Sequence, residues 1–169
     1  MKNNLVEILK KVCEIFNRHS IDYILVGGTA VALNGYFRMS FLADGKVASK
    51  LDLDFWYNPS YSNYFKLLNA LEDLGRDMTR AKEEQAPNPK KSFFRYEFEE
   101  FTLDLLPKMD SRLDFRSSFD KKEVTIFDDV QVSFLCLEDV IKDKEFHNRP
   151  KDREDIEQLK KIKSDKENL

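Results

Sequence analysis

The stretch VGGTAVALNGYFRMSFLADGKVASKLDLDFWY, residues 26–57, contains the features that decide the fold of this chain. A short apolar run ends at the pair Gly27 and Gly28, and helix-forming residues then continue as far as Gly35. This order predicts a strand, a tight turn and a helix. Strand character returns at residues 51–57, which read LDLDFWY.

The segments on both sides of this stretch extend the alternation of helices and strands. The amphipathic residues 1–16 predict an N-terminal helix. Residues 61–75 predict another helix, with Ser60 or Ser62 as its cap and Gly75 as its stop signal. The first half of the chain is therefore predicted to run helix, strand, helix, strand, helix.

The second half predicts two pairs of strands followed by two helices. The strand pairs are residues 92–98 with 101–107 and residues 123–127 with 130–135. Helical patterns follow at residues 136–146 and 150–163, and Pro150 suits the first turn of the second helix. The polar residues 76–91 contain two prolines and predict a linker strand or a loop.

Together these elements predict an α/β (α+β) fold, in which helices flank a mixed β-sheet. We expect one domain over residues 1–169. Within it we expect an N-terminal helix at 1–20, an α/β core at 21–135 and C-terminal helices at 136–169.

Composition excludes several classes of protein. The 28 basic and 31 acidic residues are interspersed and give a formal net charge of −3, so no overall cationic field is available to hold a nucleic-acid backbone. No apolar run reaches the length of a membrane span, and the N-terminal helix lacks the apolar core of a signal peptide. We therefore expect a cytoplasmic protein without membrane contact. Cys13 and Cys136 lie in apolar patterns far from other cysteines, which predicts buried, reduced thiols.

Two aspartates within a predicted strand give the first indication of function. Side chains alternate across a strand, so Asp52 and Asp54 point to one face while Leu51, Leu53 and Phe55 point to the other. Neighbouring carboxylates on a half-buried surface raise each other's pKa unless a cation or hydrogen-bond donors neutralise them. Oxygen ligands without nitrogen or sulfur partners favour Mg²⁺ or Mn²⁺ over zinc.

A third aspartate and a glycine turn extend this candidate site. Asp104 is the lone carboxylate in the predicted strand FTLDLLP, and three carboxylates would converge if that strand lies beside residues 51–57. Such a cluster can hold two metal ions for phosphoryl or nucleotidyl transfer. Gly27, Gly28 and Thr29 at a helix start would leave backbone N–H groups and a hydroxyl for a phosphate chain. Taken singly, the glycines also suit an ordinary tight turn and the aspartates an edge strand facing water. Their order along one chain favours a site.

These motifs resemble the DNA polymerase β-type nucleotidyltransferase superfamily. VGGT, LDLDF and LDLL match the three elements of its pattern, a glycine pair followed by strand-borne aspartates. The tail LEDVIKDKEFHNRPKDREDIEQL more specifically resembles the minimal bacterial nucleotidyltransferases and the AbiEii-type toxin group. The matching tail residues are Lys144, Arg149, Lys151, Asp152 and Asp155.

The resemblance implies a nucleotidyltransferase fold and a Mg²⁺-dependent (or Mn²⁺-dependent) transfer of a nucleoside monophosphate from a nucleoside triphosphate. It assigns catalysis and metal binding to Asp52, Asp54 and Asp104. Nucleotide binding would fall to Gly27, Gly28, Thr29, Lys144 and Lys151. Arg149, Asp152 and Asp155 would support the tail. The acceptor (RNA, protein or small molecule) is open, and the family implies a possible small antitoxin-like partner.

Three alternatives stay open at this point. The chain can be a non-catalytic nucleotide- or partner-binding member of the same fold, or an unrelated phosphoesterase that uses a carboxylate-bound metal. The tail residues can also form only a charged helix start, with an acidic side chain near the positive end of the helix dipole. Two departures from the family pattern accompany the resemblance: Thr29 replaces a serine, and residues 36–50 resemble an insertion at the rim of the site.

Overall fold

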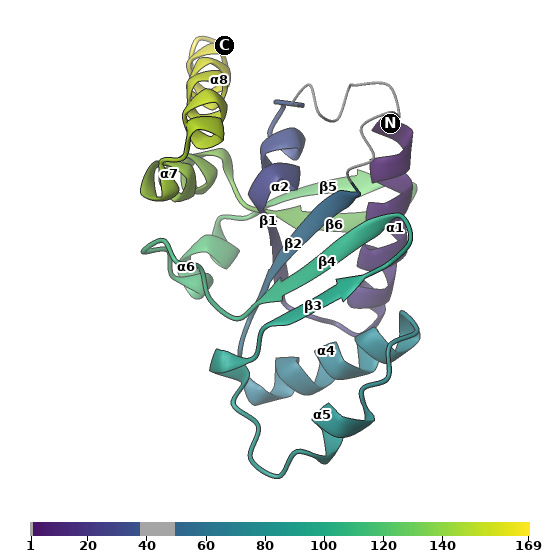
Figure 1. Ribbon diagram of the computed structural model, residues 1–169. Helices are drawn as coiled ribbons and strands as arrows, with labels where there is room; N and C mark the ends of the chain where they lie inside the picture. Colours follow the sequence, from purple (N-terminus) through teal and green to yellow (C-terminus); the bar gives the residue numbers. More distant parts are fainter. Residues whose placement is uncertain (1, 38–49) are drawn as a thin grey trace.

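The strands described by the structure form one mixed sheet in the order β3-β4-β2-β1-β6-β5 (Figure 1). This computed structural model describes residues 2–37 and 50–169. The strands are β1 (Tyr23–Val26), β2 (Leu51–Tyr57), β3 (Phe94–Glu97), β4 (Phe101–Leu106), β5 (Glu123–Phe127) and β6 (Val130–Phe134). β2 pairs in parallel with β4 and antiparallel with β1, and β1 pairs in parallel with β6. The predicted mixed sheet flanked by helices is confirmed.

The predicted helices occur in the predicted order, and the short helices α5 (Thr79–Glu83) and α6 (Phe115–Asp120) were not predicted. The others are α1 (Lys2–Arg18), α2 (Gly27–Leu33), α4 (Tyr61–Asp73), α7 (Leu137–His147) and α8 (Pro150–Glu167), with the 3-10 helix η1 (Pro89–Lys91). Both predicted hairpins are confirmed, because β3 pairs antiparallel with β4 and β5 with β6. The two C-terminal helices are confirmed as α7 and α8. None of the helices within the described residues is long and apolar enough to cross a membrane.

One face of the sheet packs against α1 and α4 and forms the larger part of the core. Leu53, Phe55 and Leu103 point to this face from β2 and β4 and are fully buried. The ring of Phe16 on α1 lies edge-on to the ring of Phe55, with 5.1 Å between centroids. The predicted burial of Cys13 and Cys136 as free thiols is also confirmed.

The opposite face is covered by the C-terminal helices over only part of its area. Ile24 and Trp56 from the sheet pack with Val31 of α2, Val140 of α7 and Leu159 of α8 in a second cluster. Figure 1 shows α7 and α8 next to α2, at the opposite end of the molecule from α4 and α5. Because β2 and β4 carry the predicted aspartates on this face, those side chains lie beside the helical cover and not within the main core.

Side-chain caps explain the helix ends. Ser60 accepts a hydrogen bond from the backbone N–H of Asn63 and begins α4, so Ser60 and not Ser62 is its cap. Asn148 ends α7 in the left-handed conformation at φ +48°, and Pro150 begins α8 two residues later. The chain therefore turns sharply between the last two helices.

The prediction for residues 76–91, a linker strand or a loop, was wrong in part because this segment contains α5 and η1. The side chain of Asp77 accepts hydrogen bonds from the backbone N–H and the hydroxyl of Thr79, which begins the helical turn. Met78 is buried and holds the segment on the core. The predicted insertion, residues 36–50, falls mostly outside the described part of the chain, since residues 38–49 are not described.

Candidate functional site

The parallel pairing of β2 and β4 brings the predicted aspartates together. Asp54 and Asp104 are register partners, and Asp52 is the partner of Thr102. Register partners on adjacent strands point to the same face and lie about 5 Å apart. The prediction that the three aspartates lie on one face of adjacent strands is therefore confirmed.

The electrostatics of this row of aspartates are unfavourable for its central member. Asp104 is 8% exposed and Asp54 is partly buried, while Asp52 is exposed. The pKa of Asp54 is raised to about 6, chiefly by burial and then by the neighbouring charges of Asp104 and Asp52. Lys144 opposes this shift by its positive charge. At neutral pH the site thus concentrates negative charge in a setting that favours a cation.

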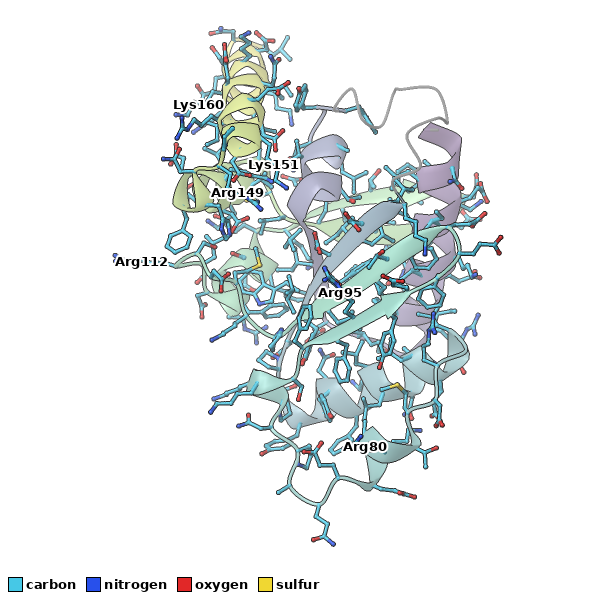
Figure 2. All side chains as sticks on the ribbon, viewed as in Figure 1. Arg80, Arg95, Arg112, Arg149, Lys151 and Lys160 are labelled. Atoms are coloured by element: carbon cyan, nitrogen blue, oxygen red, sulfur yellow. The ribbon has the colours of Figure 1, made fainter. Side chains whose placement is uncertain are left out.

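Arg95 is a member of this site that the sequence analysis missed. It lies on β3 as the register partner of Asp104. Its Nε donates to Oδ1 of Asp104 at 2.8 Å, and its Nη2 donates to Oδ2 at 2.9 Å. Figure 2 shows Arg95 over the sheet. The only signal in the sequence is an arginine between two aromatic residues, Phe94 and Tyr96, and its partner depends on the register of the hairpin.

The glycine turn contacts the aspartates directly. Gly27 has φ +68°, and a Cβ added there would lie 2.5 Å from Oδ2 of Asp54. Gly28 lies in the first turn of α2, and no side chain caps the start of this helix. Thr29 is buried, and its hydroxyl donates to the backbone carbonyl of Asp52 at 3.3 Å. The hydroxyl therefore ties α2 to β2, while the amides at the start of α2 lie next to the carboxylates.

The predicted tail residues form a buried ionic cluster between α7 and α8. Lys144 is 4% exposed, and its Nζ lies 3.3 Å from Oδ1 of Asp152 and 3.4 Å from Oδ2 of Asp155. Arg149 donates to Asp152 through Nε at 2.7 Å. Although burial raises the pKa of Asp152, the hydrogen bonds from Arg149 and the charge of Lys144 hold it below its usual range. This cluster fixes the angle between the two helices.

Lys151 differs from these neighbours because its side chain is exposed at the start of α8. Figure 2 shows Lys151 and Arg149 at the end of α8 that lies nearest α7. Lys144 thus pairs with Asp152 and Asp155 between α7 and α8, whereas Lys151 lies on the surface nearby. A contact of either lysine with nucleotide stays a prediction.

The metal-binding role of the aspartates also stays a prediction. Within residues 2–37 and 50–169, no group of three or more His, Cys, Asp or Glu side chains is arranged to hold a metal ion. Both carboxylate oxygens of Asp104 accept hydrogen bonds from Arg95. The donor set itself, three carboxylates on one face, has the hard oxygen chemistry that Mg²⁺ and Mn²⁺ prefer.

Comparison with known proteins supports the fold. No protein-family model matches the sequence, and no curated protein matches it. Five chains of solved structures match. One of them is the lincosamide antibiotic adenylyltransferase LnuA with lincomycin bound, which is 18% identical over 96% of this chain and 98% of that chain, with a TM-score of 0.51. This likeness shows the nucleotidyltransferase fold, as the sequence predicted. It does not bear on the AbiEii-type group, which stays a prediction.

We predict that Gly27→Ala destabilises the protein more than Gly75→Ala. Both glycines have positive φ, so alanine adds backbone strain of about 1–2 kcal/mol at each position. Only at Gly27 does the new methyl group also overlap Asp54, whereas nothing lies within 4 Å at Gly75. Urea denaturation should give the larger loss for Gly27→Ala, and adding Asp54→Ala should recover part of it. Equal losses for the two glycine variants would show that the turn does not press on Asp54.

We predict that Asp54→Asn stabilises the protein relative to wild type more at neutral pH than at acidic pH. Because the pKa of Asp54 in the folded state is raised to about 6, its contribution to stability is largest at low pH and is lost as the pH rises through that value. The free energy of unfolding of Asp54→Asn, relative to wild type, should therefore increase by about 1–3 kcal/mol between pH 4 and pH 7. Denaturation curves at several pH values measure this difference. A constant or falling difference contradicts the raised pKa.

Proposed function

We propose that this protein is a Mg²⁺-dependent (or Mn²⁺-dependent) nucleotidyltransferase that moves a nucleoside monophosphate from a nucleoside triphosphate to a hydroxyl group of an acceptor. The observation that carries the proposal is the register of Asp54 with Asp104, beside the Gly27 turn. Three carboxylates next to a helix start would provide a cation site beside an anion site, which is the arrangement that a metal-bound triphosphate requires.

Each predicted residue has a place in this proposal. Asp52 and Asp54 would hold divalent metal ions, and Asp104 would join them once its oxygens are free of Arg95. The metal ions would neutralise the negative charge that develops on the phosphates. The amides at Gly27 and Gly28 would bind phosphate oxygens, with Thr29 holding α2 against β2 through its bond to the Asp52 carbonyl.

The C-terminal corner would complete the nucleotide site. Lys144 acts on Asp54 by its charge, so it lies close enough to bias the cluster toward its ionised form. Asp152 and Asp155 hold this lysine in place, and Arg149 in turn holds Asp152. The exposed ammonium of Lys151 would pair with a nucleotide phosphate as a mobile charge.

The chemical step would be a substitution at the α-phosphorus. The acceptor oxygen forms a bond to this phosphorus, the bond from the phosphorus to the β-bridging oxygen breaks, and pyrophosphate leaves. The proton of the acceptor hydroxyl passes to a carboxylate of the cluster. Catalysis of this kind depends on positioning and charge neutralisation more than on covalent chemistry by the protein.

A small molecule is the acceptor class that the observations favour. The solved structure of similar fold is an adenylyltransferase bound to lincomycin, and the net charge of −3 offers no general attraction to RNA. A protein acceptor and an antitoxin-like partner rest on the sequence resemblance alone. A cytoplasmic location would suit the proposal, because nucleoside triphosphates are the substrate.

The direct test of function is identification of the product. The protein is incubated with Mg²⁺, each nucleoside triphosphate labelled at the α-phosphate, and a panel of hydroxyl-bearing small molecules that includes lincosamides. We expect a labelled acceptor together with pyrophosphate, and no product from the double variant Asp52→Asn with Asp54→Asn. Release of inorganic phosphate without a labelled acceptor would indicate a phosphoesterase. Binding without any turnover would indicate a non-catalytic member of the fold.

We also predict that Lys151→Ala weakens triphosphate binding while Lys160→Ala does not. Both lysines are exposed on α8, but Lys160 lies farther along the helix from its start and pairs with Glu145 of α7 at 3.2 Å (Figure 2). Loss of one charge-assisted contact to phosphate should cost about 1–3 kcal/mol of binding free energy. Titration of a nucleotide analogue at fixed Mg²⁺ measures the three affinities. If the two variants bind as tightly as wild type, Lys151 has no role in binding nucleotide.

A further inference from the structure

Arg95 donates hydrogen bonds to Asp104, a carboxylate that would bind metal in the proposed reaction. The guanidinium meets both oxygens of Asp104 in a bidentate pair, at 2.8 and 2.9 Å. Such pairs are the strongest class of protein ion pair, because two parallel hydrogen bonds join two planar groups. A divalent ion cannot approach the same oxygens from the side that the guanidinium occupies, since the two positive charges repel each other.

The two partners differ sharply in their surroundings. The Asp104 side chain is 11% exposed and lies on the interior strand β4, whereas the Arg95 side chain is 62% exposed on the edge strand β3. The carboxylate is therefore fixed by its strand, while the arginine side chain can rotate into solvent and leave little packing behind. If one member of the pair moves, it is Arg95.

The charge balance of the row explains why a cation is held there at all. Asp104 is the register partner of Asp54 and lies beside it on the same face. Without a neutralising group, two neighbouring carboxylates in a partly buried setting repel each other strongly. Arg95 supplies that neutralisation from the neighbouring strand.

We infer that Arg95 is an exchangeable counter-cation, which neutralises Asp104 in the free protein and is displaced from it by the divalent metal. This inference rests on the proposed function for the identity of the metal-bound ligand. A nucleoside triphosphate offers the released guanidinium a new anionic partner on the same face of the sheet. Metal and nucleotide therefore bind with positive coupling, and Arg95 is a positioning residue that links the two.

The inference predicts a gain of metal affinity when Arg95 is removed. Binding of Mn²⁺ alone is measured by the loss of free Mn²⁺ signal in electron paramagnetic resonance, for wild type and for Arg95→Gln. We expect Arg95→Gln to bind Mn²⁺ at least about 10-fold more tightly, because the competing bidentate pair is absent. Arg95→Lys, which keeps the charge but loses the planar fork, should fall between the two. Arg112→Gln, an exposed arginine on the loop before α6, is the control and should bind like wild type (Figure 2).

A second measurement tests the coupling. Repeating the titration with a non-hydrolysable nucleoside triphosphate analogue should raise the Mn²⁺ affinity of wild type by a larger factor than that of Arg95→Gln. In an Asp104→Asn background, Arg95→Gln should no longer change the affinity for Mn²⁺ alone.

The outcomes separate this inference from the proposed function. If wild type binds Mn²⁺ through Asp54 but Arg95→Gln binds no more tightly, the inference about Arg95 is wrong and the metal site stands. If Mn²⁺ binds neither protein in a way that depends on Asp52 and Asp54, both are overturned. Circular dichroism establishes whether each variant is folded. If Arg95→Gln does not fold, the Mn²⁺ affinity of Arg95→Lys is compared with that of wild type instead.

Discussion

The parallel register of β2 with β4 places the carboxylates of Asp54 and Asp104 side by side, where their negative charges repel each other. Several neighbouring residues reduce or accommodate this repulsion. Arg95 approaches Asp104 from the edge strand, and Lys144 acts on Asp54 from α7. Gly27 has no side chain where one would strike Asp54. None of these features is needed for folding alone, because hydrophobic residues in place of the two aspartates would avoid the repulsion and its cost in stability.

The stability that tolerates this arrangement comes from the opposite face of the sheet. Leu53 and Phe55 alternate with the aspartates along β2, so the same strand that exposes charge to one side buries apolar area against α1 and α4 on the other. The C-terminal helices cover part of the charged face, and the buried contacts of Lys144 with Asp152 and Asp155 join the two helices. The apolar face of the sheet and the C-terminal helices therefore support a locally unfavourable cluster. Such strained electrostatics are typical of functional sites.

The sequence predicted what depends on local pattern and missed what depends on register. Alternation in LDLDF was enough to place Asp52 and Asp54 on one face, and the order of motifs was enough to bring Asp104 to the adjacent strand. Arg95 could not be found in this way, because its contact follows from how the β3–β4 hairpin aligns. The turn at Glu99 and Glu100 lacks a residue pair that would define that alignment. The short helices α5 and α6 were missed for a related reason, because each depends on one short-range side-chain contact. Asp77 accepts hydrogen bonds from Thr79 at the start of α5, and Asp114 caps α6.

The central claim is that the registered aspartates and the glycine turn bind a metal-bound triphosphate. A crystal structure of the protein with Mn²⁺ and a non-hydrolysable nucleoside triphosphate analogue tests it most directly, because the anomalous signal of manganese identifies the metal position. We predict manganese bound by Asp52 and Asp54, with the phosphates against the start of α2. Manganese and nucleotide bound elsewhere on the protein, with the aspartates unoccupied, would contradict the claim.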